Sequence, residues 1–409
     1  MSRAGADRSL LADRMSVVKD SPTAAVSALV RERRAAGDNV INLGEGELDF
    51  DTPEHVCEAG VRAIRAGDTR YTAVGGTEEL KTAIIAKFRR EDGLDYAANE
   101  VIAATGAKQI IFNAMLATVQ DGDEVAIPTP SWVSYPDIVR VAGGTPKDIP
   151  CPASQGFKLR PDQLDRSLTP NVKWLILNSP NNPSGAVLAK DELAALADVL
   201  RRHPRVMVLS DDIYQHITYR GPASTLAAVA PDLKGRVLTV NGVSKTHSMT
   251  GWRLGFAGGP DWLVKAIATL QSQSTSNPCS VTQAAAACGL NEPIAFFRPR
   301  LQALEGRRDR TVAALNETHG MLAAEAPDGA FYVYAGCAAM IGRRTADGKD
   351  LRTDSDVAAY LVDAAGVATV PGAAFAMSPY LRIAYGVSDE ALDLALARLV
   401  EACSALTRV

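Results

Sequence analysis

The chain lacks the features that mark secreted, membrane-spanning or nucleic-acid-binding proteins. Its six cysteines are scattered over 409 residues without a C-x-x-C pair, which favours free thiols in a reducing cytoplasm over a disulfide framework. No apolar run is long enough to span a bilayer, and residues 1–14 lack the apolar centre of a secretory signal. A net charge of −4 with mixed signs provides no basic stripe for nucleic acid. We therefore expect a cytoplasmic protein with small-molecule partners.

Nucleotide-binding fingerprints are absent as well. Neither G-x-G-x-x-G nor G-x-x-x-x-G-K-[ST] occurs, so the sequence does not support a nicotinamide-dependent or nucleotide-dependent enzyme. We also predict no metal site. The length of 409 residues exceeds what one hydrophobic core ordinarily serves, which predicts two domains.

Apolar runs typical of buried strands alternate with segments of helical period. The runs are Val101–Thr105, Glu124–Pro128, Val172–Leu177, Val206–Leu209, Val237–Val240 and Leu254–Ala257. This alternation predicts an α/β protein with a mostly parallel, helix-covered sheet. A long amphipathic pattern from Ile294 to about Asn316 would link this large domain to a smaller one. The strands of the smaller sheet would be Phe331–Tyr334, Val367–Val370 and Tyr380–Ile383.

The most informative stretch of the sequence is 241–255. It sets Lys245 among small residues and places Arg253 eight positions later, just after a strand-like run. Asp211 and Tyr214 directly follow another apolar run. Ligands of open α/β sheets bind outside the carboxyl ends of the strands. We therefore expect an amine, a carboxylate and a phenol to meet at one ligand-binding edge.

This set of groups matches the needs of pyridoxal phosphate, which are a Schiff-base amine, an acid on the pyridine nitrogen, phosphate donors and a flat face for the ring. Lys245 would supply the amine, which must be neutral to react, so burial or nearby cations such as Arg253 must lower its pKa. Asp211 would supply the acid, and Tyr214 would bond the ring's phenolic oxygen. Trp132, which also follows a strand-like run, would stack on the ring.

The phosphate would bind at the start of a predicted helix. The small residues of 105–109 follow a strand-like run and open an apolar helical run, and such a helix N-terminus brings backbone N–H groups close to a dianion. Each residue has an ordinary alternative, because a lone lysine is usually a surface group, Asp211 can cap a helix and Trp132 can be a core residue. The agreement of five separate pieces with one cofactor favours the functional interpretation.

In these motifs the chain resembles the class I aminotransferases of the fold-type I pyridoxal-phosphate enzymes. It is most similar to the bacterial aspartate aminotransferase branch that includes prephenate-active members. The resemblance covers nearly the whole length and is carried by residues 18–23, 44–53, 178–183, 271–278 and 381–385. It implies a large cofactor-binding domain of residues 46–299 and a discontinuous small domain of residues 1–45 and 300–409.

The resemblance also implies a role for each matching residue. Lys245 would form the Schiff base, Asp211 would hold the pyridine nitrogen, and Trp132 would stack on the ring. Asn182 and Tyr214 would bond the ring oxygen. The groups around the phosphate would be Arg253, Ser244, and the helix start at Gly106, Ala107 and Lys108. Tyr71 would reach the phosphate of the neighbouring subunit, so that a homodimer completes each active site.

Substrate binding is implied in the same way. Arg382 would grip the α-carboxylate in two parallel hydrogen bonds, beside the backbone of Gly46 and next to Trp132 and Asn182. Lys108, helped by Lys19, would bind a distal carboxylate. These residues predict amino transfer from an amino acid, with aspartate favoured, to a 2-oxo acid such as 2-oxoglutarate by a ping-pong mechanism.

Three departures from the family pattern leave alternatives open. Leu48 stands in place of a proline and Ser131 in place of a tyrosine, and both changes are expected to lie near the substrate pocket. His247 occupies a position where an aromatic residue is common, and we interpret it as a packed histidine. The alternatives are aromatic or prephenate transamination, β-elimination and Cα–Cβ bond formation on the same scaffold. A non-catalytic regulator would need a DNA-binding module, for which there is no room ahead of Lys19.

Overall fold

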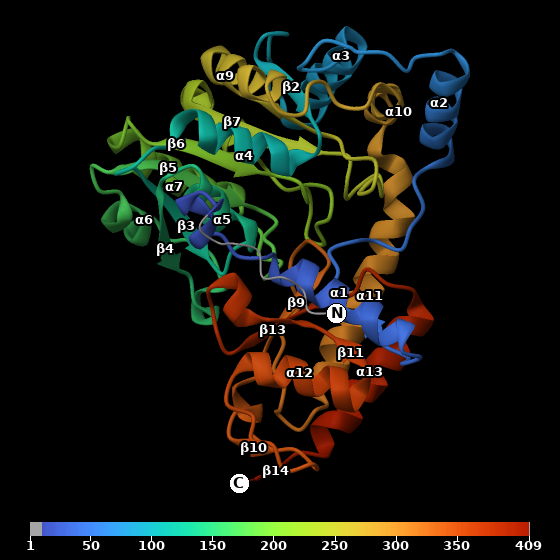
Figure 1. The fold of residues 1–409 in the computed structure, drawn as a ribbon. Helices are drawn as coiled ribbons and strands as arrows, with labels where there is room; N and C mark the ends of the chain where they lie inside the picture. The colour runs from blue at the N-terminus through green and yellow to red at the C-terminus, as the bar shows by residue number, and fades with distance from the viewer. Residues whose placement is uncertain (1–9, 409) are drawn as a thin grey trace.

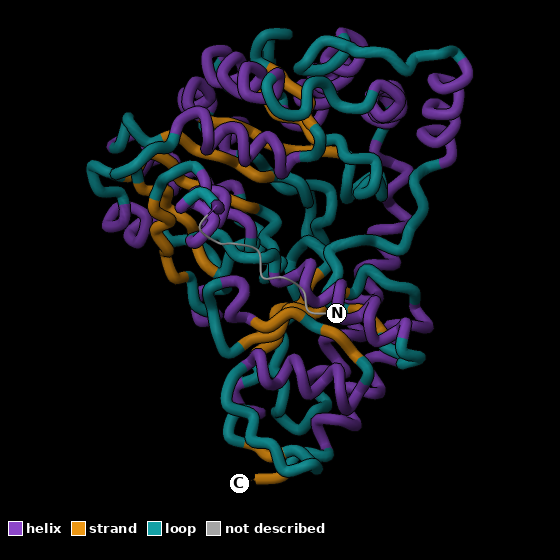
Figure 2. The backbone as a smooth tube through the Cα atoms, viewed as in Figure 1, coloured by secondary structure: helices purple, strands orange, loops and turns teal. Residues whose placement is uncertain are grey.

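The structure is a computed structural model that describes residues 10–408. A seven-stranded sheet with helices on both faces forms the upper part of Figure 1, and smaller sheets with their own helices form the lower part. Figure 2 shows the same separation, with the strands gathered in two places. Helix α11 (Arg298–Asn316) runs from one part to the other. The predicted α/β fold with a second, smaller sheet is confirmed.

The large sheet has the strand order β2-β8-β7-β6-β5-β3-β4. Its strands are β2 (Val101–Ala104), β3 (Glu124–Thr129), β4 (Thr145–Pro150), β5 (Val172–Asn178), β6 (Met207–Asp211), β7 (Val237–Gly242) and β8 (Gly255–Gly258). Strands β3 to β7 pair in parallel, whereas β8 is antiparallel to both β7 and β2. The sequence predicted all of them except β4. That edge strand is largely exposed and contains Pro146 and Pro150, so it has no buried-strand pattern.

Helices cover both faces of this sheet. One face carries α4 (Ala107–Thr118), α5 (Ser134–Val141) and α9 (Asp261–Ser272). The other carries α3 (Glu78–Lys87), α6 (Pro161–Ser167), α7 (Lys190–Arg202), α8 (Leu226–Val229) and α10 (Ser280–Asn291), with α2 (Glu54–Arg65) packed on α10. Side chains alternate along a strand, so Ile102 lies in one core and Val101 in the other. Burial on both faces explains why these strands read as uninterrupted apolar runs.

The smaller part of the fold is built around short strands. These are β1 (Ile41–Asn42), β9 (Tyr332–Gly336), β10 (Arg343–Arg344), β11 (Val367–Ala368), β12 (Val370–Pro371), β13 (Tyr380–Ala384) and β14 (Thr407–Arg408). Strands β12, β13 and β9 form an antiparallel sheet, β10 pairs with β14, and β1 pairs in parallel with β11. The helices here are α1 (Pro22–Ala35), α12 (Asp354–Ala365) and α13 (Asp389–Ser404). The β1–β11 pair joins the N-terminal segment to this part, whereas the exact domain boundaries stay a prediction.

Two predicted elements differ in detail from the structure. The predicted strand Val367–Val370 is divided at Thr369, because β11 pairs with β1 whereas β12 pairs with β13. The long helix predicted from Ile294 begins as the 3₁₀ turn η6 (Ile294–Phe297) before α11, which has a proline in its first turn. Within residues 10–408, no helix is long and apolar enough to cross a membrane.

Candidate active site

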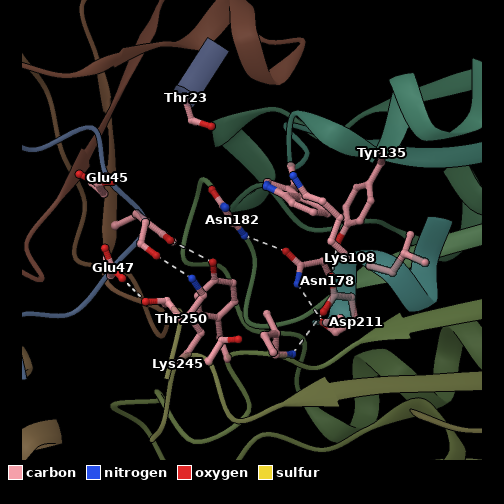
Figure 3. Close-up of a pocket in the computed structure, with 18 of the residues that line it drawn as sticks. Thr23, Glu45, Glu47, Lys108, Tyr135, Asn178, Asn182, Asp211, Lys245 and Thr250 are labelled. Carbon is pink, nitrogen blue, oxygen red and sulfur yellow. Dashed lines mark hydrogen bonds between the residues drawn. The ribbon is translucent and has the colours of Figure 1, made fainter. Parts of the chain in front are cut away.

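A cavity of about 340 Å³ lies where the carboxyl edge of the large sheet meets the smaller part of the fold (Figure 3). Strands β6 and β7 end at this edge, which brings Asp211 and Lys245 to the cavity wall. Arg253 precedes β8, and because β8 runs antiparallel, its beginning lies at the same edge. The smaller part contributes Tyr332 from β9 and Arg382 from β13. The volume is in the range of small-molecule sites in proteins.

Lys245 is partly buried in the cavity wall and makes no ion pair within the described chain. Its Nζ donates a hydrogen bond to the backbone oxygen of Gly46 at 2.6 Å. Burial lowers the pKa of Lys245 to about 8, with smaller effects from the negative Glu47, which opposes the shift, and from the positive Arg382 and Arg253, which add to it. The direction is the one that amine chemistry at this position requires.

Asp211 is a buried carboxylate in the wall of the same cavity. The Tyr135 hydroxyl donates to its Oδ2 at 2.6 Å, and the backbone N–H of Ile213 donates to its Oδ1 at 3.3 Å. Burial raises the pKa of Asp211 to about 6, against the opposing effect of the Tyr135 hydrogen bond. The Asn178 amide donates to the backbone oxygen of Asp211 at 2.8 Å and so fixes the end of β6. A carboxylate in this setting favours a cationic partner from the cavity side.

Arg382 presents a guanidinium that is only 1% exposed and has spare hydrogen-bonding capacity. Its two terminal nitrogens donate to Asn182 Oδ1 at 3.0 Å and to the Gly44 carbonyl at 2.5 Å, whereas its Nε has no partner among residues 10–408. The Tyr332 ring lies 4.6 Å from the guanidinium carbon, and the Tyr332 hydroxyl is 2.9 Å from that of Tyr214. A buried guanidinium without a carboxylate partner is a binding site for a planar anion.

The N-terminus of α4 also borders the cavity and suits an anion. Gly106 adopts a φ of 86°, and a Cβ at this position would collide with the guanidinium of Arg253. The glycine therefore lets Arg253 approach the first turn of α4, whose N–H groups have no partner within the helix. Beside them, the Nζ of Lys108 lies 4.9 Å from the centre of the Trp132 ring. Burial and the charge of Arg253 lower the pKa of Lys108.

Comparisons with known proteins agree with this geometry. The sequence model of the family "Aminotransferase class I and II" matches residues 38–399. The chain belongs to this family. The aspartate aminotransferase of Rhizobium meliloti is 49% identical over 97% of each chain, and the aspartate/prephenate aminotransferase of Cereibacter sphaeroides is 49% identical over 97% of this chain and 99% of its own length.

Solved aminotransferase structures have the same fold. That of the Rhizobium meliloti aspartate aminotransferase matches with a TM-score of 0.93 and 49% identity, over 97% of this chain and 99% of the other. The Thermus thermophilus aspartate aminotransferase with maleate matches with a TM-score of 0.90 and 39% identity, over 96% of this chain and 99% of the other. The two-part α/β architecture is therefore that of an aminotransferase.

The structure brings most of the predicted aminotransferase residues to one cavity. Those that line it are Gly46, Ala107, Lys108, Trp132, Asn182, Asp211, Tyr214, Ser244, Lys245, Arg253 and Arg382. Gly106 lies directly behind this wall, against Arg253. Two predicted residues are elsewhere. Tyr71 is 91% exposed on the surface, and Lys19 lines a neighbouring pocket that it shares with Lys108 and Arg253.

The three departures from the family pattern do not touch the cavity. Leu48 is buried in the core of the smaller part, and Ser131 is buried behind the tryptophan that lines the cavity. Both residues lie near the cavity, as predicted, because each is next to a lining residue, Glu47 or Trp132, but neither side chain lines it. His247 is a packed histidine, as predicted, because its Nε2 lies 3.3 Å from the Gly289 oxygen and its ring lies against Phe296. Burial lowers the pKa of His247 to about 4, which keeps it neutral.

Several lining residues had no predicted role. They are Thr23, Glu45, Glu47, Ile111, Tyr135, Asn178, Ile213, Thr250 and Tyr332. Tyr135 carried a usable signal, since it follows Trp132 by only three positions and lies in the first turn of α5. Their rings are in fact in edge contact at 5.2 Å. Tyr332 had no such signal in the sequence. Its position at the cavity depends on how the smaller part of the fold packs against the large sheet.

Proposed function

We propose that this aminotransferase binds pyridoxal phosphate and transfers an amino group from aspartate to a 2-oxo acid such as 2-oxoglutarate. The observation that carries the proposal is the arrangement of Lys245, whose pKa is lowered to about 8, in one cavity with the buried carboxylate of Asp211 and the unpaired guanidinium of Arg382. These three groups meet the separate needs of a carbonyl cofactor and an amino acid substrate.

The residues present fit the cofactor. The start of α4 suits a phosphate group, because Gly106 lets the guanidinium of Arg253 lie against the first turn, where a Cβ would collide with it. Asp211 suits a protonated ring nitrogen, because it is buried and forms no ion pair with the residues that the structure describes. Asn182, Tyr214 and Trp132 line the space between these two ends. When bound, the cofactor supplies an aldehyde for the amine and a ring that accepts electrons from the substrate.

The chain's own residues then divide the work of the reaction. Arg382 binds the substrate α-carboxylate with its planar fork, which fixes the position of the Cα atom. The Nζ of Lys245 takes the Cα proton as a general base and returns it at the other end of the transfer, and a pKa of about 8 suits both directions near neutral pH. The Asp211 carboxylate would accept a hydrogen bond from the protonated ring nitrogen of the cofactor. Burial keeps Tyr214 protonated, since it raises the pKa of that phenol well above its usual range.

Lys108 supports a dicarboxylic substrate. It is the lysine that lines the cavity beyond Trp132, and burial and Arg253 lower its pKa, which makes a second carboxylate a favourable partner. The related Thermus thermophilus structure is described with maleate, a dicarboxylate. A second candidate function, prephenate transamination, is supported by the similarity to the aspartate/prephenate aminotransferase of Cereibacter sphaeroides. Both substrates carry a second carboxylate, so Lys108 serves either reaction.

The donor half-reaction of the cofactor-loaded enzyme tests this proposal. Aspartate, glutamate and phenylalanine are each added, and the loss of the visible cofactor band is followed. We expect aspartate to react most efficiently. A Lys108→Met variant should lose about 10-fold in kcat/KM for aspartate and little for phenylalanine, because a charged contact is worth about 1.5–3 kcal/mol only where the substrate has the matching charge. Failure of aspartate and glutamate alongside conversion of a bulkier amino acid would overturn the aspartate assignment.

We also infer a homodimer with shared active sites. Tyr71 is 91% exposed, and Ile64 and Trp262 are further large exposed side chains of the same part of the fold. This exposure leaves these side chains available to a partner chain. A Tyr71→Ala protomer and a Lys245→Ala protomer, each with little activity, should regain activity when refolded together, because one site of the hybrid keeps both residues. No regain, with a monomeric mass in solution, would contradict the shared site.

A further inference from the structure

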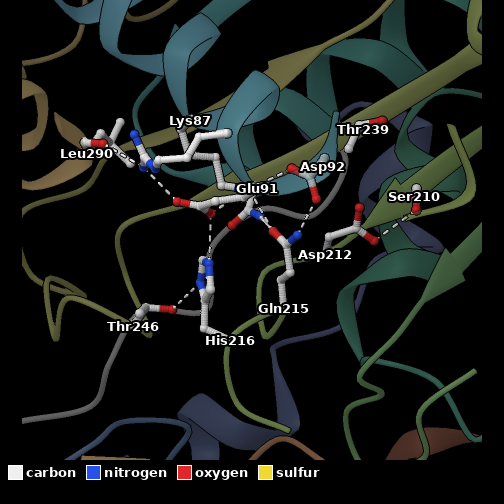
Figure 4. Close-up of polar contacts among 12 residues, drawn as sticks. Lys87, Glu91, Asp92, Ser210, Asp212, Gln215, His216, Thr239, Thr246 and Leu290 are labelled. Carbon is white, nitrogen blue, oxygen red and sulfur yellow. Dashed lines mark hydrogen bonds and ion pairs between the residues drawn. The ribbon is translucent and has the colours of Figure 1, made fainter. Parts of the chain in front are cut away.

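We propose that a buried polar network behind the cavity positions Lys245 for the reaction. This rear network consists of Lys87, Glu91, Asp92, Gln215 and His216 (Figure 4). None of the five lines the cavity, so they act through their neighbours and are positioning residues. The inference rests on the proposed function, because it assigns these residues to the orientation of the reactive amine.

Lys87 is the centre of the rear network. It ends α3, is 2% exposed, and its Nζ donates to Gln215 Oε1 at 2.6 Å and to Asp92 Oδ2 at 3.0 Å. The carboxylate of Glu91 lies 3.4 Å away. Both acids belong to the π-helical turn η3 (Phe88–Asp92). In this turn both carboxylates lie near the Lys87 ammonium group. One buried cation thus anchors two carboxylates and an amide.

The first branch of the rear network leads to the residue after Lys245. Glu91 Oε2 lies 2.8 Å from His216 Nε2, and His216 Nδ1 lies 3.2 Å from the Thr246 hydroxyl. Burial alone would raise the pKa of Glu91, but the His216 hydrogen bond and the Lys87 charge lower it to about 2. The ionised Glu91 accepts from Nε2–H, which fixes the ring and leaves Nδ1 to hold the hydroxyl of Thr246.

The second branch reaches the two loops that carry the ring-facing residues. Gln215 directly follows Tyr214, and its Oε1 also accepts from the Asn241 amide at 2.8 Å. Asn241 lies near the end of β7, where the chain leads into Lys245, and its own Oδ1 accepts the backbone N–H of Gly242 at 2.7 Å. The loops after β6 and β7 are therefore tied to the same anchor from the side away from the cavity.

The rear network matters because the Lys245 amine has few contacts of its own. Lys245 has a long, flexible side chain, and its Nζ has one polar contact in the described chain, with the Gly46 oxygen. The direction of its Cα–Cβ bond must then be set by the backbone, and the neighbouring Thr246 is 2% exposed with His216 as the partner of its hydroxyl. Displacement of a catalytic group by about 1 Å costs up to about 100-fold in rate.

A matched pair of substitutions at Thr246 tests the inference. Thr246→Val keeps the shape and removes the hydroxyl, whereas Thr246→Ser keeps the hydroxyl. We expect Thr246→Val to lower kcat about 10-fold with KM for the amino acid changed less than about twofold, and Thr246→Ser to keep most of the activity. Hydrogen exchange of residues 241–248 in the cofactor-free protein should rise in the valine variant and not in the serine variant.

Thr318→Val is the control for a purely structural loss. The Thr318 hydroxyl is buried in the smaller part, donates to the Leu315 oxygen at 2.6 Å and accepts from the Leu322 N–H at 2.9 Å. This variant should lower the melting temperature with kcat unchanged. His216→Gln gives a second route, and the double variant with Thr246→Val should lose no more kcat than the larger single loss, since one contact is removed twice.

Unchanged kcat in both Thr246→Val and His216→Gln would overturn the inference, as would an equal loss of kcat in Thr246→Val and Thr246→Ser. Failure of the proposed function gives a different result. If aspartate does not react with the wild type, the kcat comparison is made with the amino acid that does. The exchange measurement needs neither substrate nor cofactor, so it reports on the rear network in either case.

Discussion

Two lysines in this structure contrast the proposed reactive amine with a structural one. Lys87 is enclosed by protein and sits between the carboxylates of Glu91 and Asp92. Lys245 lies in the cavity wall with a backbone oxygen as its hydrogen-bond partner, and burial lowers its pKa to about 8. Burial by itself therefore does not create a nucleophile. The difference is direct contact, because two carboxylates lie within ion-pair distance of the Lys87 ammonium group and none in the described chain lies that close to Lys245.

Removal of the Lys245 amine should give the largest effect. Lys245→Ala is expected to reduce transamination by about 10⁴-fold or more, because both the attachment point of the cofactor and the general base are lost. The visible band of the bound cofactor should disappear with it. The cofactor-free protein should keep its stability within about 1 kcal/mol, since no ion pair is broken. Near-normal transamination with an unchanged band would refute the assignment of Lys245.

Removal of the Lys87 charge should show the opposite pattern in stability. Lys87→Met leaves two carboxylates in the protein without their cation, which is expected to cost about 3 kcal/mol of unfolding free energy. Chemical denaturation of the cofactor-free protein measures the loss. The exposed Lys190→Met is the control and should change stability by less than about 0.5 kcal/mol. Equal effects at the two positions would show that Lys87 is not held by its carboxylates.

The pH dependence of cofactor uptake sharpens the comparison with a smaller effect. Only the neutral amine attacks an aldehyde, so a lowered pKa raises the reactive fraction at neutral pH. With a pKa of about 8, the fraction at pH 7 is about 200-fold above that of an ordinary lysine. The rate of uptake by the cofactor-free protein, followed by absorbance, should rise with pH up to about 8 and then level off. A rate that still climbs through pH 10 would contradict the lowered pKa.

The strands of the large sheet were predictable because burial on both faces leaves a simple trace in the sequence. Val101–Ala104 is apolar at every position, whereas the edge strand Thr145–Pro150 has no such pattern and was not predicted. The division of 367–370 between two sheets was not predictable either. It depends on the arrival of Ile41–Asn42 beside Val367, and nothing local in the sequence records that pairing.

The candidate site was predictable for residues at or just after the end of a strand, as Asp211 and Lys245 are. Tyr332 and Glu45 reach the cavity through the packing of the smaller part against the large sheet. The rear network could not be predicted from the sequence either, because its residues come from two distant parts of the chain. His216 and Glu91 are 125 residues apart in sequence, and a histidine and a glutamate at that separation carry no mark of contact.

The pairing of β1 with β11 has a consequence for the order in which the chain folds during synthesis. All seven strands of the large sheet lie between residues 101 and 258, so this sheet can assemble on a chain that is still growing. The smaller part cannot finish until Val367 has left the ribosome, and until then Ile41 has no strand to join. Ribosome-bound chains should therefore expose the N-terminal segment to chaperones and proteases long after the sheet that carries Lys245 is in place.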